Sequence, residues 1–304
     1  MKCLVTGCAG FIGSTLSEVL LEKGQEVTGL DCFTDYYSRQ VKESNISNIV
    51  NSDKFSFFEN DVANVIDADA DVVFHLAAQP GVRKSWGKEF DLYTRHNILA
   101  TQRLLEACKD VKKFVFVSSS SVYGNTNIPF HEDQPLNPVS PYGISKLACE
   151  HLCKAYSDKI DISIVRLFTV YGPRQRPDMA FHKFIKAAIE GEKIVINGNN
   201  ITRDFTYIDD IVDGIIRSAS SSGNFEIYNL GGGKSSSVDK AVDIIRDLSG
   251  KNLNIERTEA ARGDMESTLA DITKARKNLG YNPKTELREG LKKEFEWMRS
   301  IINS

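Results

Sequence analysis

Tyr142 and Lys146 are the residues of this 304-residue chain whose types and spacing first suggest chemistry. Tyr142 is the only one of the ten tyrosines that has a lysine four residues later. Ser140 can cap a helix and Pro141 suits its first turn, so the tyrosine and the lysine should share one helical face. An ammonium beside a phenol favours the phenolate, and a phenolate can remove a proton from a hydroxyl.

A run of four serines, from Ser118 to Ser121, follows an apolar, β-rich segment at residues 114–117. The run is therefore expected at the carboxyl end of a strand, where open α/β sheets bind their ligands. A serine hydroxyl at that place can hydrogen-bond a sugar oxygen and relay its proton. Without the tyrosine–lysine pair, an ordinary polar loop would be the simpler interpretation.

A glycine-rich turn joins the first predicted strand, residues 2–6, to the first predicted helix, residues 14–23. Its glycines are Gly7, Gly10 and Gly13, which allow a tight turn and a close approach of the backbone to a pyrophosphate. The helix N-terminus that follows offers N–H groups and a positive dipole end to the phosphates. The pattern predicts a dinucleotide-binding turn.

Asp31 follows the second predicted strand, residues 26–30, and lies 18 residues after Gly13. A carboxylate there accepts hydrogen bonds from both ribose hydroxyls of adenosine and repels a 2′-phosphate, which predicts NAD rather than NADP. His75, taken alone, is more typical of a packed histidine than of a catalyst. Further residues expected at the cofactor are Phe11, Ile12, Phe33, Asp61, Val62, Leu76, Ala77, Ala78, Gln79, Asn97 and Val170.

The elements that must position these residues alternate between strand and helix patterns, which predicts a parallel sheet covered on both faces. Further strands are expected at residues 71–76, 113–118, 162–167 and 193–196, and further helices at residues 98–109, 142–155, 181–190 and 238–248. The prediction is an α/β fold, a Rossmann-type doubly wound parallel sheet with a smaller C-terminal α/β substrate-binding part.

The composition excludes several classes of protein. Lys and Arg number 38 against 41 Asp and Glu, and the sequence pI is near 6.0, which argues against a general nucleic-acid binder. No apolar run approaches the roughly 18 residues of a membrane helix, and the N-terminus lacks a signal-peptide pattern. The six cysteines show no paired metal spacing. We therefore expect a cytoplasmic protein with no metal, disulfide, membrane or nucleic-acid partner.

Several motifs together resemble the extended short-chain dehydrogenases/reductases, and within them the NAD-dependent nucleotide-sugar epimerases and dehydratases. The resemblance covers essentially the whole chain. The motifs that carry it are the glycine turn at residues 7–13, Asp31, residues 118–124, Tyr142-Gly143-Ile144-Ser145-Lys146, residues 203–210, Arg262-Gly263-Asp264 and residues 270–275.

The resemblance implies a chemistry for the tyrosine–lysine pair. Tyr142 would take the proton of the sugar 4-hydroxyl with the assistance of Ser119, while C4 gives its hydride to NAD. Lys146 would hold the nicotinamide ribose. Return of the hydride to the other face of the 4-keto sugar would invert C4. The implied organisation is a NAD-binding domain at residues 1–167 and a nucleotide-sugar-binding domain at residues 168–304, with residues 203–230 either in the second domain or packed back on the first.

The residues after Ser119 distinguish the members of this family. Its 4,6-dehydratases carry Asp-Glu there, and UDP-glucuronate decarboxylases carry Glu where this chain has Ser121. Here both positions are serines, Ser120 and Ser121, so elimination and decarboxylation lack their expected catalyst. The resemblance therefore favours a 4-epimerase. A catalytically idle NAD-binding protein is the alternative from another class, and the intact Ser119, Tyr142 and Lys146 argue against it.

The stretch around Arg176 resembles the UDP-glucuronate 4-epimerases, because epimerases of neutral UDP-hexoses commonly have an acid at this position. A guanidinium offers a planar fork to the C6 carboxylate, with Ser119, Ser120, Ser121 and Thr169 as hydroxyl donors. A surface arginine that caps the loop is the other interpretation, and a UDP-glucose or UDP-N-acetylglucosamine 4-epimerase is the alternative function. We expect Arg203 and Arg262 at the diphosphate and Arg83 near the sugar.

A homodimer is expected by analogy with the family. The helical stretches at residues 93–109 and 142–156 carry apolar residues such as Leu99, Leu147 and Leu152, and two such helices from each subunit could form a four-helix interface. In the alternative, these residues face their own sheet.

Overall fold

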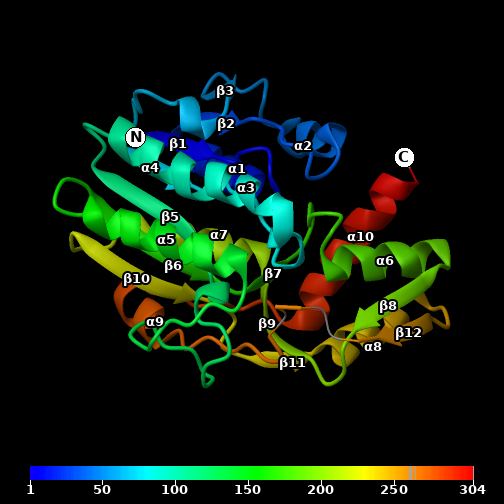
Figure 1. The fold of residues 1–304 in the computed structure, drawn as a ribbon. Helices are drawn as coiled ribbons and strands as arrows, with labels where there is room; N and C mark the ends of the chain where they lie inside the picture. The colour runs from blue at the N-terminus through cyan, green and yellow to red at the C-terminus, as the bar shows by residue number, and fades with distance from the viewer. Residues whose placement is uncertain (260–261, 264, 304) are drawn as a thin grey trace.

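A computed structural model describes residues 1–259, 262–263 and 265–303. Its largest element is a seven-stranded sheet whose strand pairs are all parallel, in the order β10-β6-β5-β4-β1-β2-β3 (Figure 1). The strands are β1 (Lys2–Thr6), β2 (Glu26–Asp31), β3 (Phe55–Glu59), β4 (Val72–His75), β5 (Lys113–Ser119), β6 (Asp161–Leu167) and β10 (Phe225–Leu230). The predicted Rossmann-type fold is confirmed.

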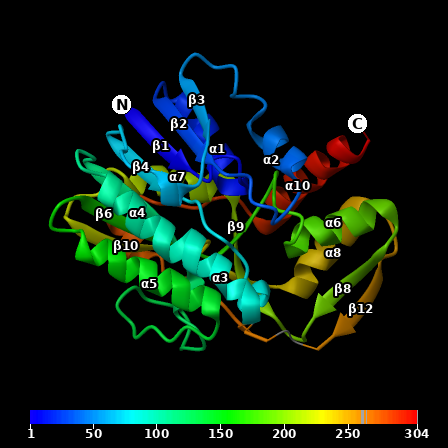
Figure 2. The same cartoon turned by 45° about the horizontal axis from the view of Figure 1, so that its top comes forward.

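Helices cover both faces of this sheet, because its strands alternate apolar side chains between two cores. Along β5, for example, Phe114 and Phe116 belong to one buried cluster and Val115 to the other. The first core is closed by α4 and α5, and the second by α1 and α7 (Figures 1 and 2). The helices are α1 (Phe11–Glu22), α2 (Arg39–Ile46), α3 (Phe90–Tyr93), α4 (Ala100–Ala107), α5 (Pro141–Ala155) and α7 (Ile208–Ser218).

A smaller α/β part lies beside the carboxyl ends of the large sheet (Figures 1 and 2). It contains a three-stranded sheet, in the order β11-β9-β7, and a parallel pair of β8 with β12. The elements are β7 (Thr169–Tyr171), β8 (Lys193–Asn197), β9 (Thr202–Tyr207), β11 (Ser235–Ser237), β12 (Asn254–Thr258), α6 (Ala180–Glu190), α8 (Val238–Ser249) and α10 (Leu287–Ile302). Helix α9 (Thr273–Leu279) packs instead against β10 and α7 of the large part.

Residues 203–230 divide between the two parts. Strand β9 pairs with β7 and β11, whereas β10 pairs with β6 in the large sheet. The division of the chain at residue 167 into two domains stays a prediction. No helix in the described ranges is long and apolar enough to span a bilayer.

Two expected helices begin elsewhere than predicted. Helix α1 begins at Phe11, because the turn before it is so tight that a Cβ on Gly13 would lie 2.1 Å from the carbonyl oxygen of Gly7. The helix expected at residues 98–109 begins with a π-helical segment (Thr94–Leu99) and continues as α4. The wider π turn places Asn97 toward the serine at position 145 of α5, to which it donates a hydrogen bond of 2.9 Å.

Helix α10 buries a carboxyl group that has no hydrogen-bond partner in the described part of the chain. Glu294 is fully buried, and its neighbour, the hydroxyl of Tyr171, is also buried without a partner. Burial raises the pKa of Glu294 well above its usual range. The carboxyl is therefore neutral at a pH where an ordinary glutamate is charged.

Replacement of Glu294 by glutamine should stabilise the protein increasingly as the pH rises. Unfolding releases the proton of Glu294 at any pH between its unfolded and folded pKa values, so the free energy of unfolding falls by about 1.4 kcal/mol per pH unit in that window. Glutamine carries no such proton. Urea unfolding at pH 5, 6 and 7 should therefore give a growing advantage to Glu294→Gln. The exposed Glu296 on the same helix serves as control, and a pH-independent difference for Glu294→Gln would contradict this account.

Candidate functional site

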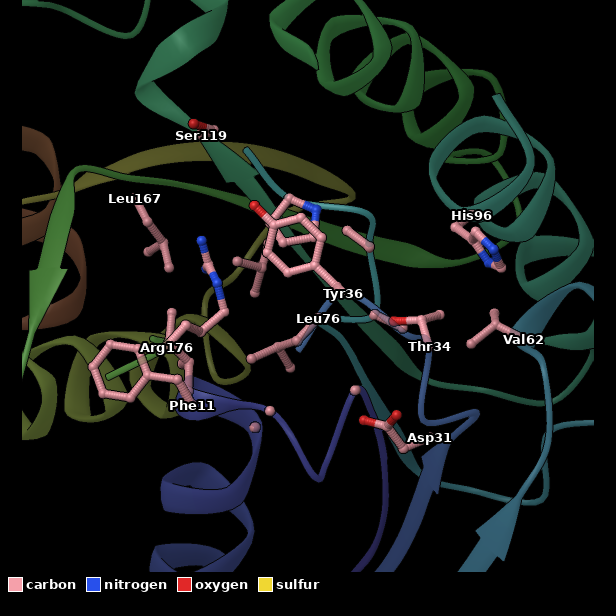
Figure 3. A pocket seen from close by; sticks show the side chains of 18 of the residues that line it. Phe11, Asp31, Thr34, Tyr36, Val62, Leu76, His96, Ser119, Leu167 and Arg176 are labelled. Carbon is pink, nitrogen blue, oxygen red and sulfur yellow. The ribbon is translucent and has the colours of Figure 1, made fainter. Parts of the chain in front are cut away.

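A cavity of about 250 Å³ opens at the carboxyl ends of the large sheet, where the strands meet the smaller part (Figure 3). Its wall contains Gly7 after β1, Asp31 at the end of β2, Leu76 after β4, Ser119 at the end of β5 and Leu167 at the end of β6. Parallel sheets of this topology bind ligands at this edge. The cavity is therefore the candidate active site.

The glycine turn forms one wall of the cavity. Gly7 has a φ of +72°, and a Cβ on it would lie 2.8 Å from the backbone nitrogen of Ala77, so only glycine fits the close approach of β1 and β4. Phe11, Ile12 and Gly13, the first turn of α1, line the cavity. Backbone N–H groups of a first helical turn have no acceptor within the helix, and they form an anion site suited to a pyrophosphate.

Asp31 lies at the other side of this turn, and its carboxylate is held by two backbone groups. It accepts hydrogen bonds from the N–H of Ala9 at 3.2 Å and of Phe33 at 2.9 Å. Burial raises its pKa, while these N–H groups and the ammonium of Lys42 oppose the shift. Each carboxylate oxygen can accept a second hydrogen bond, so Asp31 keeps acceptor capacity for ribose hydroxyls.

The catalytic candidates Ser119, Tyr142 and Lys146 line the same cavity. Helix α5 begins at Pro141, and the side chain of Ser140 caps it by accepting a 3.1 Å hydrogen bond from the N–H of Gly143. The Lys146 ammonium donates a 2.7 Å hydrogen bond to the carbonyl oxygen of β5 residue 117, which fixes the helix against the strand end.

The serine run is close to α5 and contains no acid. A Cβ on Gly143 would lie 2.5 Å from the carbonyl oxygen of Ser121, so the helix and the run can meet only at a glycine. The hydroxyls of Ser119 and Ser121 lie 3.1 Å apart. Among the described residues that line the cavity, the carboxylates are Asp31 and Asp61, which both belong to the predicted cofactor end.

Arg176 lines the cavity and points toward Tyr36 (Figure 3), with its guanidinium 5.8 Å from the ring centre. The structure adds a partner that sequence analysis did not foresee. Asp178 accepts two hydrogen bonds from Arg176, at Nε (2.9 Å) and Nη2 (3.0 Å), and a third from the Tyr36 hydroxyl at 3.1 Å. A substrate carboxylate would meet this guanidinium at Nη1, or would displace Asp178.

The other three arginines that were predicted at the substrate, Arg83, Arg203 and Arg262, do not line this cavity. Arg203 donates to the backbone oxygens of Thr202 at 2.9 Å and Glu266 at 3.0 Å. Arg262 stacks on Trp86, with its guanidinium 3.7 Å from the ring centre, which brings it to the loop of Arg83. Asp264, part of the predicted motif, lies outside the described residues. Three other predicted substrate residues follow or separate lining residues in the sequence but do not line the cavity themselves. They are Ser120, Ser121 and Thr169. The substrate roles of all these residues stay predictions.

Most of the predicted cofactor residues line the cavity, and three do not. These three are Phe33, Gln79 and Asn97. Asn97 is buried and supports the wall from behind: it accepts from the N–H of Gln79 at 2.7 Å and donates to its carbonyl oxygen at 3.2 Å. His75 is also fully buried, between Thr6 and Thr101, and burial lowers its pKa to about 3.

Several residues that line the cavity were not predicted from the sequence. The aromatic pair Tyr36–Tyr37 follows the predicted cofactor residue Asp31 by five and six positions, so its place in the sequence carried a signal. Lys42 and His96 lie on helical segments with no local motif, and only the fold brings them here. The residues in question are Cys32, Thr34, Tyr36, Tyr37, Lys42, Pro80, His96, Ala100, Val117, Ser118, Leu167, Phe168 and Met179.

Comparison with known proteins agrees with this geometry. The family model described as GDP-mannose 4,6 dehydratase matches residues 4–294. The chain belongs to this family. A UDP-glucuronate 4-epimerase of Thermodesulfobacterium geofontis is 41% identical over 313 residues, covering 98% of this chain and 96% of the relative. An uncharacterized UDP-glucose epimerase of Bacillus subtilis is 44% identical and covers 99% of both chains.

Solved structures extend the comparison to the whole fold. The UDP-glucuronic acid 4-epimerase of Bacillus cereus, in complex with UDP-glucuronic acid and NAD, superimposes with a TM-score of 0.94 at 42% identity. The match covers 99% of this chain and 100% of that one. A UDP-glucose 4-epimerase of Thermotoga maritima, solved with UDP-glucose, gives a TM-score of 0.91 at 29% identity. The chain is therefore similar both to an epimerase solved with a charged sugar nucleotide and to one solved with a neutral sugar nucleotide.

Replacement of Asn97 by alanine should destabilise the protein by about 2 kcal/mol, because the mutation leaves the buried backbone groups of Gln79 without partners. Urea unfolding checks this expectation. Asn48→Ala is the matched control, since Asn48 is exposed and makes one 3.5 Å hydrogen bond. Equal losses for the two variants would contradict the supporting role of Asn97.

Proposed function

We propose that this protein interconverts UDP-glucuronate and UDP-galacturonate by NAD-dependent inversion at C4. The observation that carries the proposal is the arrangement of Ser119, Tyr142 and Lys146 on one cavity with the glycine turn and Asp31. The same cavity offers a place for a dinucleotide and a base for a sugar hydroxyl. The relatives that bind UDP-glucuronic acid and NAD support this assignment.

The cofactor site has the shape and chemistry that NAD requires. The first turn of α1 would hold the pyrophosphate, and Asp31 would accept the adenosine ribose hydroxyls. Lys146 would hold the ribose of the nicotinamide. When bound, NAD supplies a hydride acceptor and returns the same hydride, so that the sugar passes through a 4-ketone.

The chain's own residues handle the proton. The Tyr142 oxygen removes the proton from the sugar 4-hydroxyl, and Ser119 hydrogen-bonds the same oxygen. After the keto sugar has turned in the site, the Tyr142 hydroxyl returns the proton to O4 and C4 is inverted. The positions that carry acids in dehydratases and decarboxylases are Ser120 and Ser121, so the carboxylate that removes water or assists loss of CO₂ in those enzymes is missing from these positions.

The preference for a hexuronate rests on Arg176. A guanidinium beside the sugar pocket offers charge-assisted hydrogen bonds to a C6 carboxylate. Polar contacts to that carboxylate also oppose decarboxylation of the 4-keto acid, because loss of CO₂ is eased by desolvation. The pairing of Arg176 with Asp178 favours the second candidate function, a 4-epimerase of neutral UDP-hexoses, since a neutral sugar leaves the pair undisturbed.

A homodimer through α3, the π-helical segment and α5 is part of the proposal. Leu92, Leu99 and Ile144 are exposed on these elements, at 39%, 39% and 51%. Leu147 and Leu152, in contrast, pack against the chain's own cores. The three exposed residues are therefore the contacts that a second copy would cover.

Incubation of the purified protein with UDP-glucuronate should yield UDP-galacturonate without added reductant. Proton NMR distinguishes the two by the coupling of the sugar H4. UDP-glucose and UDP-N-acetylglucosamine, under the same conditions, should turn over at least about tenfold more slowly, which corresponds to one charge-assisted contact. Clean turnover of UDP-glucose without conversion of UDP-glucuronate would assign the second candidate function instead.

Replacement of Tyr142 by phenylalanine should reduce the rate of epimerisation by at least about a hundredfold, because it removes the proton-transfer group and little volume. The NAD content of the purified protein and the affinity for UDP should stay close to those of the parent. Tyr156→Phe, at the C-terminal cap of the same helix, is the control, since the Tyr156 hydroxyl bonds Glu106 and Gln102, neither of which lines the cavity. Undiminished turnover by Tyr142→Phe would refute the assigned base.

A further inference from the structure

Residues 172–179, which we term the bridging segment, connect β7 to α6 and close one side of the cavity. Arg176 and Met179 line the cavity from this segment, and neither residue belongs to a helix or a strand. The position of the segment therefore decides how two of the lining side chains face the sugar and the cofactor.

One end of the bridging segment is fixed to the smaller part of the molecule. The side chain of Gln175 is buried and donates a 3.1 Å hydrogen bond to the carbonyl oxygen of Val170 on β7. It also accepts a 2.8 Å hydrogen bond from the N–H of His182 on α6. These bonds hold the segment to β7 and α6, but they do not connect it to the glycine turn.

The connection to the glycine turn is an ion pair between Arg174 and Glu18 on α1. Both amino groups of the guanidinium bond the carboxylate, at 2.6 Å and 2.7 Å, and the two side chains are only 16% and 22% exposed. Neither residue lines the cavity. Helix α1 also supplies Phe11, so the helix that offers its N-terminus to the cavity is the helix that anchors the segment.

The backbone of Arg174 indicates that the pair has more than a surface role. Its φ is +67°, in the left-handed region that favours glycine. An arginine in this conformation carries a backbone cost that the surrounding structure must offset. The bidentate pairing of the Arg174 guanidinium with the Glu18 carboxylate is such a compensating interaction. Its two charge-assisted hydrogen bonds also fix the direction of the arginine side chain.

We propose that Glu18 and Arg174 are a positioning pair that fixes the bridging segment over the bound dinucleotide. The pair touches neither cofactor nor substrate; it acts through the segment, which carries Arg176 and Met179. A second link, from the Tyr36 hydroxyl to Asp178, ties the far end of the segment to the loop after β2. This inference rests on the proposed function for the identity of the cofactor and the sugar.

Two single variants should loosen the segment. Glu18→Gln removes the negative charge with little change of shape, and Arg174→Lys keeps the positive charge but loses the bidentate fork. Each should speed the release of NAD from the purified, NAD-loaded protein about tenfold, the effect of losing one such charge-assisted contact. The KM for UDP-glucuronate should rise by a similar factor, while kcat falls less than threefold, since the catalytic residues are untouched.

The charge-swapped double variant, Glu18→Arg with Arg174→Glu, tests whether the two residues act on each other. Residue 174 keeps a Cβ in the swap, so its backbone strain is unchanged and only the direction of the pair is reversed. The swap should recover most of the slow NAD release of the parent. Release from the swap as fast as from either single variant would overturn the proposal.

A matched control comes from α7, where Arg217 bonds Asp213 at 2.6 Å on an exposed face. Asp213→Asn removes one helix carboxylate that is paired with an arginine, as Glu18→Gln does, but the arginine belongs to the same helix and not to the bridging segment. It should leave NAD release and KM within twofold of the parent. Release by Glu18→Gln and Arg174→Lys within the same twofold range would also overturn the proposal.

The release of NAD separates this inference from the proposed function. If the parent protein holds NAD but does not convert UDP-glucuronate, the proposed function fails, and the release rates of the variants still test the pair. If the parent converts UDP-glucuronate and the single variants release NAD at the parental rate, the function stands and the positioning pair is refuted.

Discussion

The contact of helix α5 with the carboxyl end of β5 is the constraint on which the rest of the site depends. Gly143 lets the helix approach the serine run, and the Lys146 ammonium bonds a carbonyl of the strand at 2.7 Å. One turn further, Glu150 accepts a 2.6 Å hydrogen bond from Ser118 and two from Arg166 on β6. Tyr142 and Ser119 therefore come from two elements whose relative position is fixed by buried, charge-assisted bonds.

The charges around the cavity stand beside groups that compensate them. The ammonium of Lys42 lies near Asp31, Asp178 bonds the guanidinium of Arg176, and the ammonium of Lys146 bonds a carbonyl of β5. The chain as a whole carries a net charge of −3, so attraction for an anionic ligand cannot come from its overall field. It comes from single cations and from the N-terminus of α1, whose positions set where each part of a nucleotide sugar and a dinucleotide can lie.

The glycine turn, Asp31, the serine run and the tyrosine–lysine pair could all be predicted from sequence, because each depends on neighbours a few residues away. Most strand and helix patterns of the first half were equally local, but β3 and α2 were not predicted. Strand β10 and the Arg174–Glu18 pair could not be predicted, since both depend on contacts between residues more than sixty positions apart.

The pairing of Arg176 with Asp178 could not be predicted from sequence for a different reason. Asp178 is only two residues away, but sequence shows neither that its carboxylate turns back on the guanidinium nor that the Tyr36 hydroxyl joins them. Asn97 shows the same limit: its residue type suits a cofactor contact, and burial directs it to the backbone of Gln79 instead. Residue type and spacing predict which groups are present, whereas packing decides which of them face the ligand.

The pairing of Arg176 with Asp178 means that this guanidinium already has a counter-ion before a sugar binds. A hexuronate carboxylate that binds there replaces one anion by another or shares the guanidinium with it, so recognition becomes an exchange of counter-ions rather than the capture of a free charge. Such an exchange yields little net electrostatic energy, and it rewards the ligand whose carboxylate fits best. Selectivity between sugars is then a matter of geometric matching more than of attraction.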